Sequence, residues 1–102
     1  MERIEYFKNY SKYVKEMKKL LSEHLKEFQL YVFGSVLDDY SVGLSDIDIA
    51  IVSDEFKSRE KKLRAYDVLF EKYFYSPFEF HLLTKKEWEF FLRFVGKKFI
   101  KF

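Results

Sequence analysis

The chain has 102 residues, of which 48% are hydrophobic and 35% are charged, and its formal net charge is +2. This length is enough for one modest hydrophobic core, and the composition excludes an intrinsically disordered protein. The near balance of charge does not demand a nucleic-acid partner, although it leaves that class of partner open. We therefore expect one globular domain that spans residues 1–102.

The residue types that are missing or abundant further limit the class of protein. No cysteine occurs, which excludes disulfides, thiol chemistry and a cysteine-based zinc site. No stretch approaches the roughly 18 apolar residues of a membrane span, and the N-terminus lacks the apolar run of a signal peptide, so we expect a soluble, cytoplasmic protein. Aromatic residues make up 22% of the chain, which favours either an aromatic-rich core or an exposed surface for a partner or a second copy.

From Glu2 to Phe28, apolar residues recur at steps of three and four. This spacing predicts one face of an amphipathic helix, or of two helices in line. The apolar positions are Phe7, Tyr10, Val14, Met17, Leu21, Leu25 and Phe28. Lysines and glutamates fill most of the remaining positions, so we expect the opposite face to be solvated.

A glycine and a serine follow the first predicted strand. The segment Leu30–Phe33 is short and consists of aliphatic and aromatic residues, which is typical of a buried strand. Gly34 lacks a Cβ atom, so the backbone and a bulky ligand can approach each other closely there. Ser35 offers a hydroxyl group and, if a helix begins here, free N–H groups that suit a phosphate.

Two carboxylates begin the second predicted strand, Asp46–Val52. Isoleucines alternate there with Asp46, Asp48 and an alanine. Side chains two residues apart share a face of a strand, so the isoleucines can face the core while both carboxylates project from the other side. Carboxylates this close repel one another unless a cation lies between them, and hard oxygen ligands suit Mg²⁺. We interpret Asp38 and Asp39, in the ten residues before this strand, as solvated or helix-capping.

The pattern Gly34-Ser35-x10-Asp46-x-Asp48 resembles the signature of the minimal nucleotidyltransferases, which are small members of the DNA polymerase β superfamily. The resemblance implies that Asp46 and Asp48 are catalytic metal ligands, and that Gly34 and Ser35 bind the nucleotide. Several proteins of this kind resemble the antitoxin half of HEPN–MNT toxin–antitoxin pairs, so the resemblance implies such a role as an expectation.

A second long helix is predicted from Ser58 to Phe74. Ser58 has the residue type of a helix N-cap, because its hydroxyl can accept a backbone N–H bond. The predicted apolar side consists of Leu63, Tyr66, Leu69 or Phe70, and Tyr73. Asp67 lies inside this helix, and we expect it at the surface.

Pro77 ends the helical pattern, and Phe78–Leu83 is predicted to form a third strand. Glu79 and His81 share one of its faces. In the resembled family a third carboxylate, usually aspartate, lies on a strand at this point. The resemblance therefore implies that Glu79 is catalytic and binds metal directly or through water, the alternative being an exposed glutamate on an edge strand. We expect His81 to be structural, to orient Glu79 or to touch the acceptor.

The last part of the chain begins with a helix signal. Thr84-Lys85-Lys86-Glu87 has the form of a capping box, which predicts a helix that runs to about Val95 and stops at Gly96. The tail from Lys97 to Phe102 is both basic and apolar. We expect it to dock a partner, to clamp a nucleic acid or nucleotide, or to fray.

The predicted elements alternate between helices and strands, which argues for an α/β class with helices packed against a sheet. Periodicity does not give the directions of the strands. The family resemblance implies a small mixed β-sheet with the nucleotidyltransferase fold.

The same resemblance implies a Mg²⁺-dependent nucleotidyl transfer. Asp46, Asp48 and Glu79 would hold the metal, and an acceptor hydroxyl would attack the α-phosphorus of ATP or another nucleoside triphosphate. The implied acceptor is a tyrosine of a partner HEPN toxin, which would receive AMP. Two alternatives remain open: an acceptor that is a nucleic-acid end or a small-molecule hydroxyl, and a non-catalytic antitoxin that acts by binding its partner.

Overall fold

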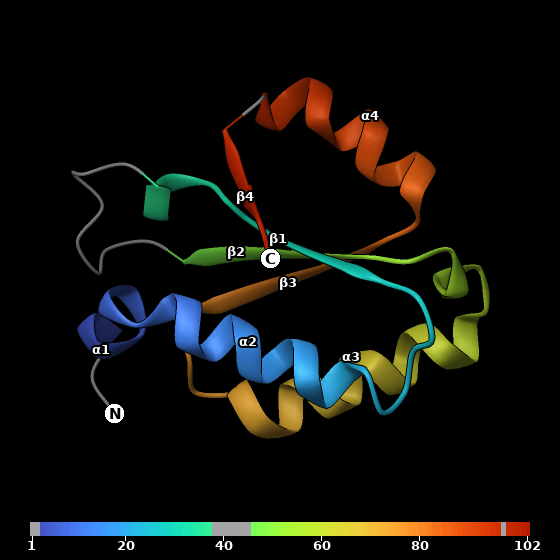
Figure 1. The fold of residues 1–102 in the computed structure, drawn as a ribbon, viewed down its shortest axis with the longest axis horizontal. Coiled ribbons are helices and arrows are strands. Elements are labelled where there is room, and N and C mark those ends of the chain that lie inside the picture. Colours follow the sequence, from blue (N-terminus) through green and yellow to red (C-terminus); the bar gives the residue numbers. More distant parts are fainter. Residues whose placement is uncertain (1–2, 38–45, 97) are drawn as a thin grey trace.

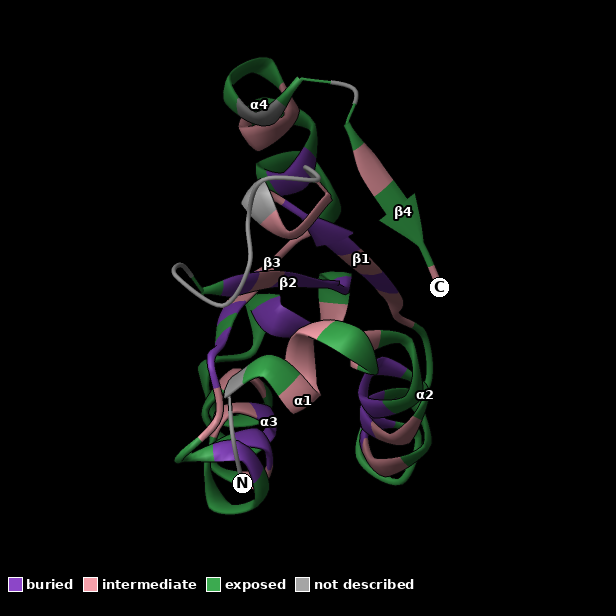
Figure 2. Cartoon of the chain, turned by 90° about the vertical axis from the view of Figure 1, so that its left-hand side faces the viewer, coloured by how far each residue is buried: buried purple, intermediate pink, exposed green. Residues whose placement is uncertain are grey.

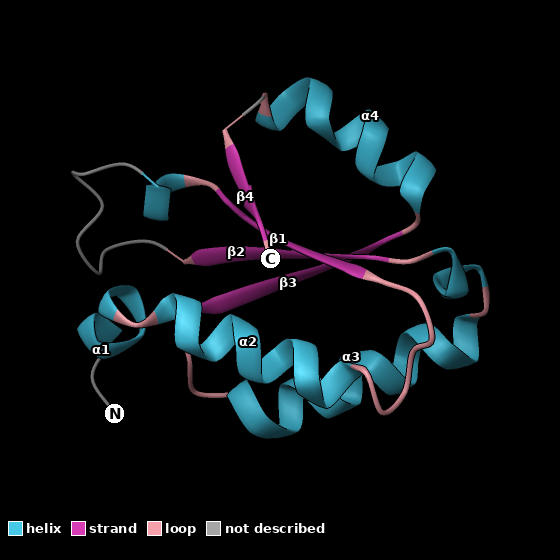
Figure 3. Cartoon of the chain, viewed as in Figure 1, coloured by secondary structure: helices cyan, strands magenta, loops and turns pink. Residues whose placement is uncertain are grey.

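The computed structural model describes residues 3–37, 46–96 and 98–102, which form one mixed β-sheet with helices on both faces (Figures 1 and 3). The strands are β1 (Gln29–Phe33), β2 (Ile47–Val52), β3 (Phe78–Leu83) and β4 (Phe99–Lys101). The order in the sheet is β3-β2-β1-β4. β2 runs parallel to β3, whereas β1 runs antiparallel to both β2 and β4. This arrangement confirms the predicted fold class, including the mixed sheet.

Helices cover the two faces of the sheet unequally. The α-helices are α1 (Arg3–Lys8), α2 (Tyr10–Leu21), α3 (Arg59–Tyr73) and α4 (Lys85–Val95), and two short 3₁₀ turns are η1 (Ser35–Leu37) and η2 (Asp54–Lys57). α1, α2 and α3 lie on one side of the sheet, which we name the three-helix face, and α4 lies alone on the other, the α4 face (Figures 1 and 2). No helix of the described residues has the length and apolarity to cross a membrane.

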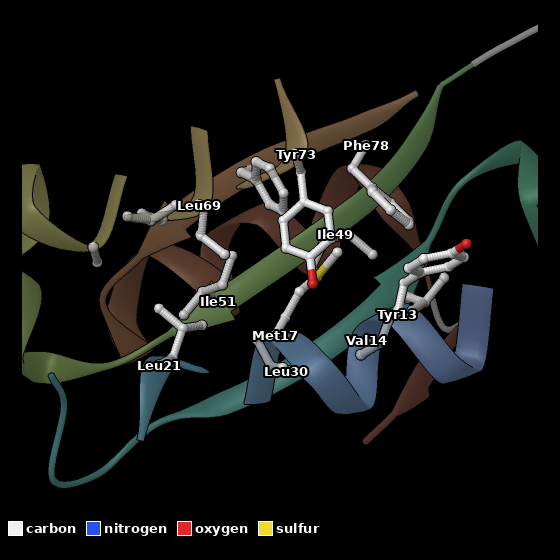
Figure 4. Close-up of a cluster of buried hydrophobic side chains, with 14 of the residues drawn as sticks. Tyr13, Val14, Met17, Leu21, Leu30, Ile49, Ile51, Leu69, Tyr73 and Phe78 are labelled. Carbon is white, nitrogen blue, oxygen red and sulfur yellow. The ribbon is translucent and has the colours of Figure 1, made fainter. Parts of the chain in front are cut away.

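The isoleucines of β2 form the centre of the core on the three-helix face. Ile47, Ile49 and Ile51 have no exposed surface. They belong to one cluster with buried side chains of α2 and α3, among them Met17 and Leu69 (Figure 4). The alternation of β2 predicted this burial, and it leaves Asp48 on the opposite face.

A second, smaller cluster lies between the sheet and α4. Its buried members are Phe33, Ala50, Val52 and Trp88, and Tyr31, Leu83, Phe91, Leu92 and Phe99 pack against them. The rings of Tyr31 and Trp88 stack with their centroids 4.6 Å apart. We name this group the α4 cluster. It covers only part of the α4 face, because polar residues occupy the start of β2 and β3.

The outer edge of β3 is covered by side chains. Ile47 N–H donates to Pro77 O and Ser53 N–H to Leu83 O, so odd-numbered residues of β3 bond to β2 and even-numbered ones face the free edge. Tyr66 Oη donates to the free carbonyl of Phe80 at 3.1 Å. The N–H of Phe78 in turn donates to Ser76 Oγ at 3.3 Å.

The N-terminal prediction left open one helix or two, and the structure has two, α1 and α2, but the prediction was wrong about where the helical segment ends. The helical pattern extended to Phe28, whereas α2 ends at Leu21 and turns follow it. The N–H groups of Lys26 and Glu27 both donate to Glu55 Oε2, at 2.8 and 2.9 Å, instead of continuing a helical ladder. Leu25 is nevertheless buried. The apolar pattern therefore predicted correctly that Leu25 is buried, although the residue lies outside the helix.

The prediction for α3 was right about its N-cap and partly wrong about its buried side. Ser58 Oγ accepts a bond from Lys61 N–H, and Asp67 is exposed as expected. The buried positions are Ala65, Leu69 and Tyr73, which are spaced four residues apart. Leu63 was predicted to lie on the buried side but is 53% exposed. The side of the helix that carries Ala65, Leu69 and Tyr73 faces the sheet instead.

The C-terminal helix follows its prediction, but the tail does not. Thr84 and Glu87 form the capping box, and Gly96 ends α4 with φ +76°. None of the three expectations for the tail included a strand, and Phe99–Lys101 forms β4 on the edge of β1. Phe102 N–H donates to Leu30 O at 2.8 Å, so the tail continues the sheet. Three residues are too few to give a recognisable alternation.

Candidate active site

Two carboxylates from neighbouring strands lie side by side on the α4 face. β2 and β3 run parallel with Asp48 opposite Glu79, so the starts of both strands meet at the same edge of the sheet. Asp48 is on this face because the isoleucines on either side of it are drawn into the core. Glu79 is there for the same reason, since Phe78 and Phe80 on either side of it are buried.

The side chain of His81 contacts Asp48. It lies two residues after Glu79 and therefore on the same face of β3. Its Nε2 is 3.2 Å from Asp48 Oδ1. The imidazole ring packs against two phenyl rings that also contact each other, with centroids 5.2 Å from Phe33 and 5.6 Å from Phe91. The α4 cluster therefore extends up to the polar group and holds one of its members.

Asp48, Glu79 and His81 form a group of potential metal ligands. One donor atom of each residue lies within 4.8 Å of the donors of the other two. The side chains of Asp48 and His81 are 23% and 24% exposed, and Glu79 is exposed, so the group is open to solvent on one side. Among the described residues, Asp46 does not belong to this group; it precedes β2 and is exposed.

Gly34 lies against the carboxylate of Asp48. Phe33 is paired with Asp48 across β1 and β2, and Gly34 follows it with φ +88°. A Cβ atom on Gly34 would overlap Oδ2 of Asp48. Glycine at this position thus serves both the backbone conformation and the space that the carboxylate needs. The structure shows that the chain approaches its own acidic residue at Gly34, and the close approach of a ligand there stays a prediction.

Part of the predicted nucleotide cradle falls outside the described residues. Ser35 begins the η1 turn, but its side chain is outside the part that the structure describes. Asp38 and Asp39 lie entirely outside the described residues, as does the rest of the segment 38–45 with the loop predicted at 41–45. The roles predicted for these residues remain predictions.

The mixed sheet and its helices agree with the comparison to known protein families. Residues 15–100 match the family described as "Polymerase beta, Nucleotidyltransferase". The chain belongs to this nucleotidyltransferase family. The match includes Asp46, Asp48 and Glu79, and it begins within α2 and ends in β4.

Two solved structures are similar to the nucleotidyltransferase described here, and both are described as a "putative nucleotidyltransferase". The first is 46% identical over 88% of this chain and 97% of its own, with a TM-score of 0.77. The second, from Sulfolobus solfataricus, is 20% identical over 98% of this chain and 85% of its own, with a TM-score of 0.68, and it shares the fold. No curated protein matches the sequence.

The donor set of the site fits a divalent cation. Enzymes of the nucleotidyltransferase family typically use such an ion, and the two carboxylates of Asp48 and Glu79 provide hard oxygen ligands for it. The space that Gly34 leaves beside Asp48 keeps this carboxylate from being covered by a side chain. Sequence reasoning did not find the contact of His81 with Asp48. The shared face of Glu79 and His81 was visible in the alternation, but the parallel pairing that brings them to Asp48 was not.

Proposed function

We propose that this nucleotidyltransferase transfers AMP from ATP to a tyrosine hydroxyl of a partner protein of the HEPN toxin type, and so acts as its antitoxin. The observation that carries the catalytic part is the group formed by Asp48, Glu79 and His81 on two parallel strands. The identity of the partner rests on the resemblance of the motif from Gly34 to Asp48 to minimal nucleotidyltransferases.

The reaction joins the acceptor oxygen to the α-phosphorus of ATP. The bond between this phosphorus and the bridging oxygen to the β-phosphate breaks, and pyrophosphate leaves with the electron pair. Glu79 accepts the proton of the acceptor hydroxyl, in keeping with its exposed position. Asp46, Asp48 and Glu79 would hold Mg²⁺, which supplies positive charge against the triphosphate when bound. Gly34 and Ser35 would contact the β- and γ-phosphates.

Exposed aromatic side chains support a protein partner. Phe74, Tyr75 and Phe94 are 64%, 92% and 75% exposed, and Phe70 and Phe90 are also exposed. Large apolar side chains gathered on a surface are typical of protein–protein contacts. Phe70, Phe74 and Tyr75 lie at the end of α3 on the three-helix face, whereas Phe90 and Phe94 lie on α4 on the opposite face (Figure 1). The α4 group shares its face with the potential metal ligands, so a partner bound there could bring a tyrosine to the site.

The first experiment incubates the protein with Mg²⁺ and ATP labelled at the α-phosphate, with and without the partner that co-purifies from cells. Mass spectrometry then locates any added AMP. We expect label on a tyrosine of the partner, and its formation should fall on the order of 10³-fold in Asp48→Asn, because several kcal/mol of transition-state stabilisation are lost. The matched control is Asp67→Asn, which alters an exposed carboxylate of α3 and should keep full activity.

Other outcomes separate the alternatives. Label on a nucleic-acid end or on a small molecule would change the acceptor but keep the enzyme class. A stable complex with the partner and no label anywhere would contradict catalysis and favour an antitoxin that acts by binding. An Asp46→Asn or Asp48→Asn protein that fails to fold would show that these carboxylates serve the structure instead.

A further inference from the structure

The distance between two of the potential ligands suits a shared metal ion. Asp48 Oδ1 and His81 Nε2 are 3.2 Å apart. Adjacent ligands of a six-coordinate ion with bonds of about 2.1 Å lie about 3 Å from each other. The same nitrogen donates a hydrogen bond to Asp48 in one tautomer and presents a lone pair in the other. The contact thus places a nitrogen donor where a cation bound to Asp48 would be in reach.

The imidazole ring is held in this orientation. Phe33 of β1 and Phe91 of α4 contact it from two elements, and His81 is itself part of β3. Its side chain is only 24% exposed. A ligand that is fixed before the ion arrives loses little conformational freedom on binding, which raises the affinity of the site. Glu79, in contrast, is exposed and can adjust its carboxylate to an ion.

We propose that His81 is a direct ligand of the cation, and that the site therefore binds first-row transition dications such as Mn²⁺ in preference to Mg²⁺. The imidazole nitrogen would join the carboxylates of Asp48 and Glu79, with which it forms one group, and that of Asp46 in the proposed function. Mg²⁺ favours an all-oxygen shell that includes water, whereas an imidazole nitrogen strengthens the binding of transition dications, most for the later ones and least for Mn²⁺, which makes Mn²⁺ the most stringent probe. This inference rests on the proposed function for the presence of a cation at the site, but it concerns which ion is bound and through which atoms.

The test measures the binding of Mn²⁺ alone, without nucleotide or partner. Electron paramagnetic resonance counts free Mn²⁺ and gives its Kd, and competition gives the Kd of Mg²⁺. Pulsed measurements on the bound ion detect coupling to a ligand ¹⁴N nucleus. We expect this coupling in the wild-type protein and its loss in His81→Gln. The preference for Mn²⁺ over Mg²⁺ should fall about tenfold in that variant, because the nitrogen ligand is lost.

The matched control is His24→Gln. The chain has two histidines, and His24 is exposed in the turn that follows α2, on the three-helix side of the sheet. This variant should keep both the nitrogen coupling and the preference for Mn²⁺. If His81→Gln does not fold, the coupling in the wild-type protein and in His24→Gln still decides the question, since only His81 then remains as its source.

Two results would overturn the inference. Bound Mn²⁺ without nitrogen coupling would mean that His81 only donates a hydrogen bond to Asp48, and failure of Mn²⁺ to bind would remove the site. The proposed function is separable from both, because it is read from transferred AMP. Transfer with Mg²⁺ and no nitrogen coupling would leave that function standing, whereas nitrogen coupling without any transfer would contradict the function and keep the metal site.

Discussion

Strands β1, β2 and β3 contribute side chains to both faces of the sheet, and the two faces differ in role. On the three-helix face, Ile47, Ile49 and Ile51 are fully buried among apolar side chains. On the α4 face, one helix covers one end of the strands with aromatic residues, and the other end carries Asp48, Glu79 and His81. Stability and chemistry are therefore separated by alternation along each strand. The comparison teaches that residues one position apart in β2 should respond very differently to substitution.

The largest difference in stability is expected between neighbours in β2. Ile49→Ala should lower the free energy of unfolding by about 2–5 kcal/mol, because it removes a fully buried side chain and leaves a cavity. Asp48→Ala should change it by less than about 1 kcal/mol, because the residue is partly exposed and has one described side-chain bond, to His81. Urea denaturation measures both. A cost for Asp48→Ala equal to that of Ile49→Ala would contradict the division between the faces.

Among the described residues, Gly34 and Gly96 have positive φ, and substituting them should separate backbone strain from damage to the site. Gly34→Ala and Gly96→Ala should each destabilise the protein by about 1–3 kcal/mol, because alanine disfavours these conformations. Only the Cβ at Gly34 overlaps Asp48, since nothing lies within 4 Å of the one at Gly96. Gly34→Ala should therefore also weaken Mn²⁺ binding, at least about tenfold. Equal metal affinities in the two variants would show that Gly34 matters only for its backbone.

Removing the N-cap of α4 should cost less stability, and the loss should be confined to the α4 face. Thr84 Oγ1 accepts a bond from Glu87 N–H, and Glu87 Oε1 accepts one from Thr84 N–H. Thr84→Ala should cost about 1 kcal/mol of unfolding free energy, whereas Thr84→Ser keeps the hydroxyl and should cost less. Hydrogen exchange should show faster opening of α4 in Thr84→Ala, with α2 and α3 unchanged. Faster exchange throughout all helices would mean that α4 does not open by itself.

The smallest expected effect is a pH dependence of the stability, which arises at Glu55 in the segment after β2. The N–H groups of Glu27 and Lys26 and the ammonium of Lys61 lower the pKa of Glu55 from its ordinary value of 4.5. A folded-state pKa below the unfolded one means that this stabilisation is complete above pH 4.5 and is lost as the pH falls through the lowered pKa. Glu55→Gln should be less stable than the wild type at neutral pH.

The same comparison at low pH provides the control for Glu55. The difference between the wild type and Glu55→Gln should shrink as the pH falls below 4.5, where the wild-type carboxyl becomes protonated. Thermal denaturation across this range measures it. A difference that is constant with pH would show that the effect comes from something other than the charge of Glu55.

The sequence was sufficient where burial and local chemistry gave the same answer. Alternation placed the β2 isoleucines in the core and Glu79 with His81 on one face of β3, and the Thr84 and Ser58 caps are where their residue types predict them. These features depend on residues close together in the chain, so their pattern can be read directly. The roles of Gly34, Ser35, Asp46, Asp48 and Glu79 stay predictions, because they concern ligands.

The misplaced features depend on contacts between distant segments. The carboxylate of Glu55 accepts hydrogen bonds from the N–H groups of Lys26 and Glu27, which a continued α2 would use for its own helical bonds. Glu55 is far from these residues in the sequence, so no local pattern predicts this contact. The open edge of β1 accepts the tail as β4, although three residues carry little strand signal of their own. The contact of His81 with Asp48 needs the parallel register of β2 and β3, which periodicity does not specify.

The side chains along the edge of β3 have a consequence for how this molecule can associate. An uncovered edge strand is a template on which another chain can add a strand, in regulated complexes as well as in fibrous aggregates. Tyr66 already occupies the Phe80 carbonyl, and Ser76 occupies the Phe78 N–H. An incoming strand would have to displace both bonds beside the acidic group. Extension of the sheet into a continuous ribbon is thereby discouraged at the edge where it would bury the chemistry.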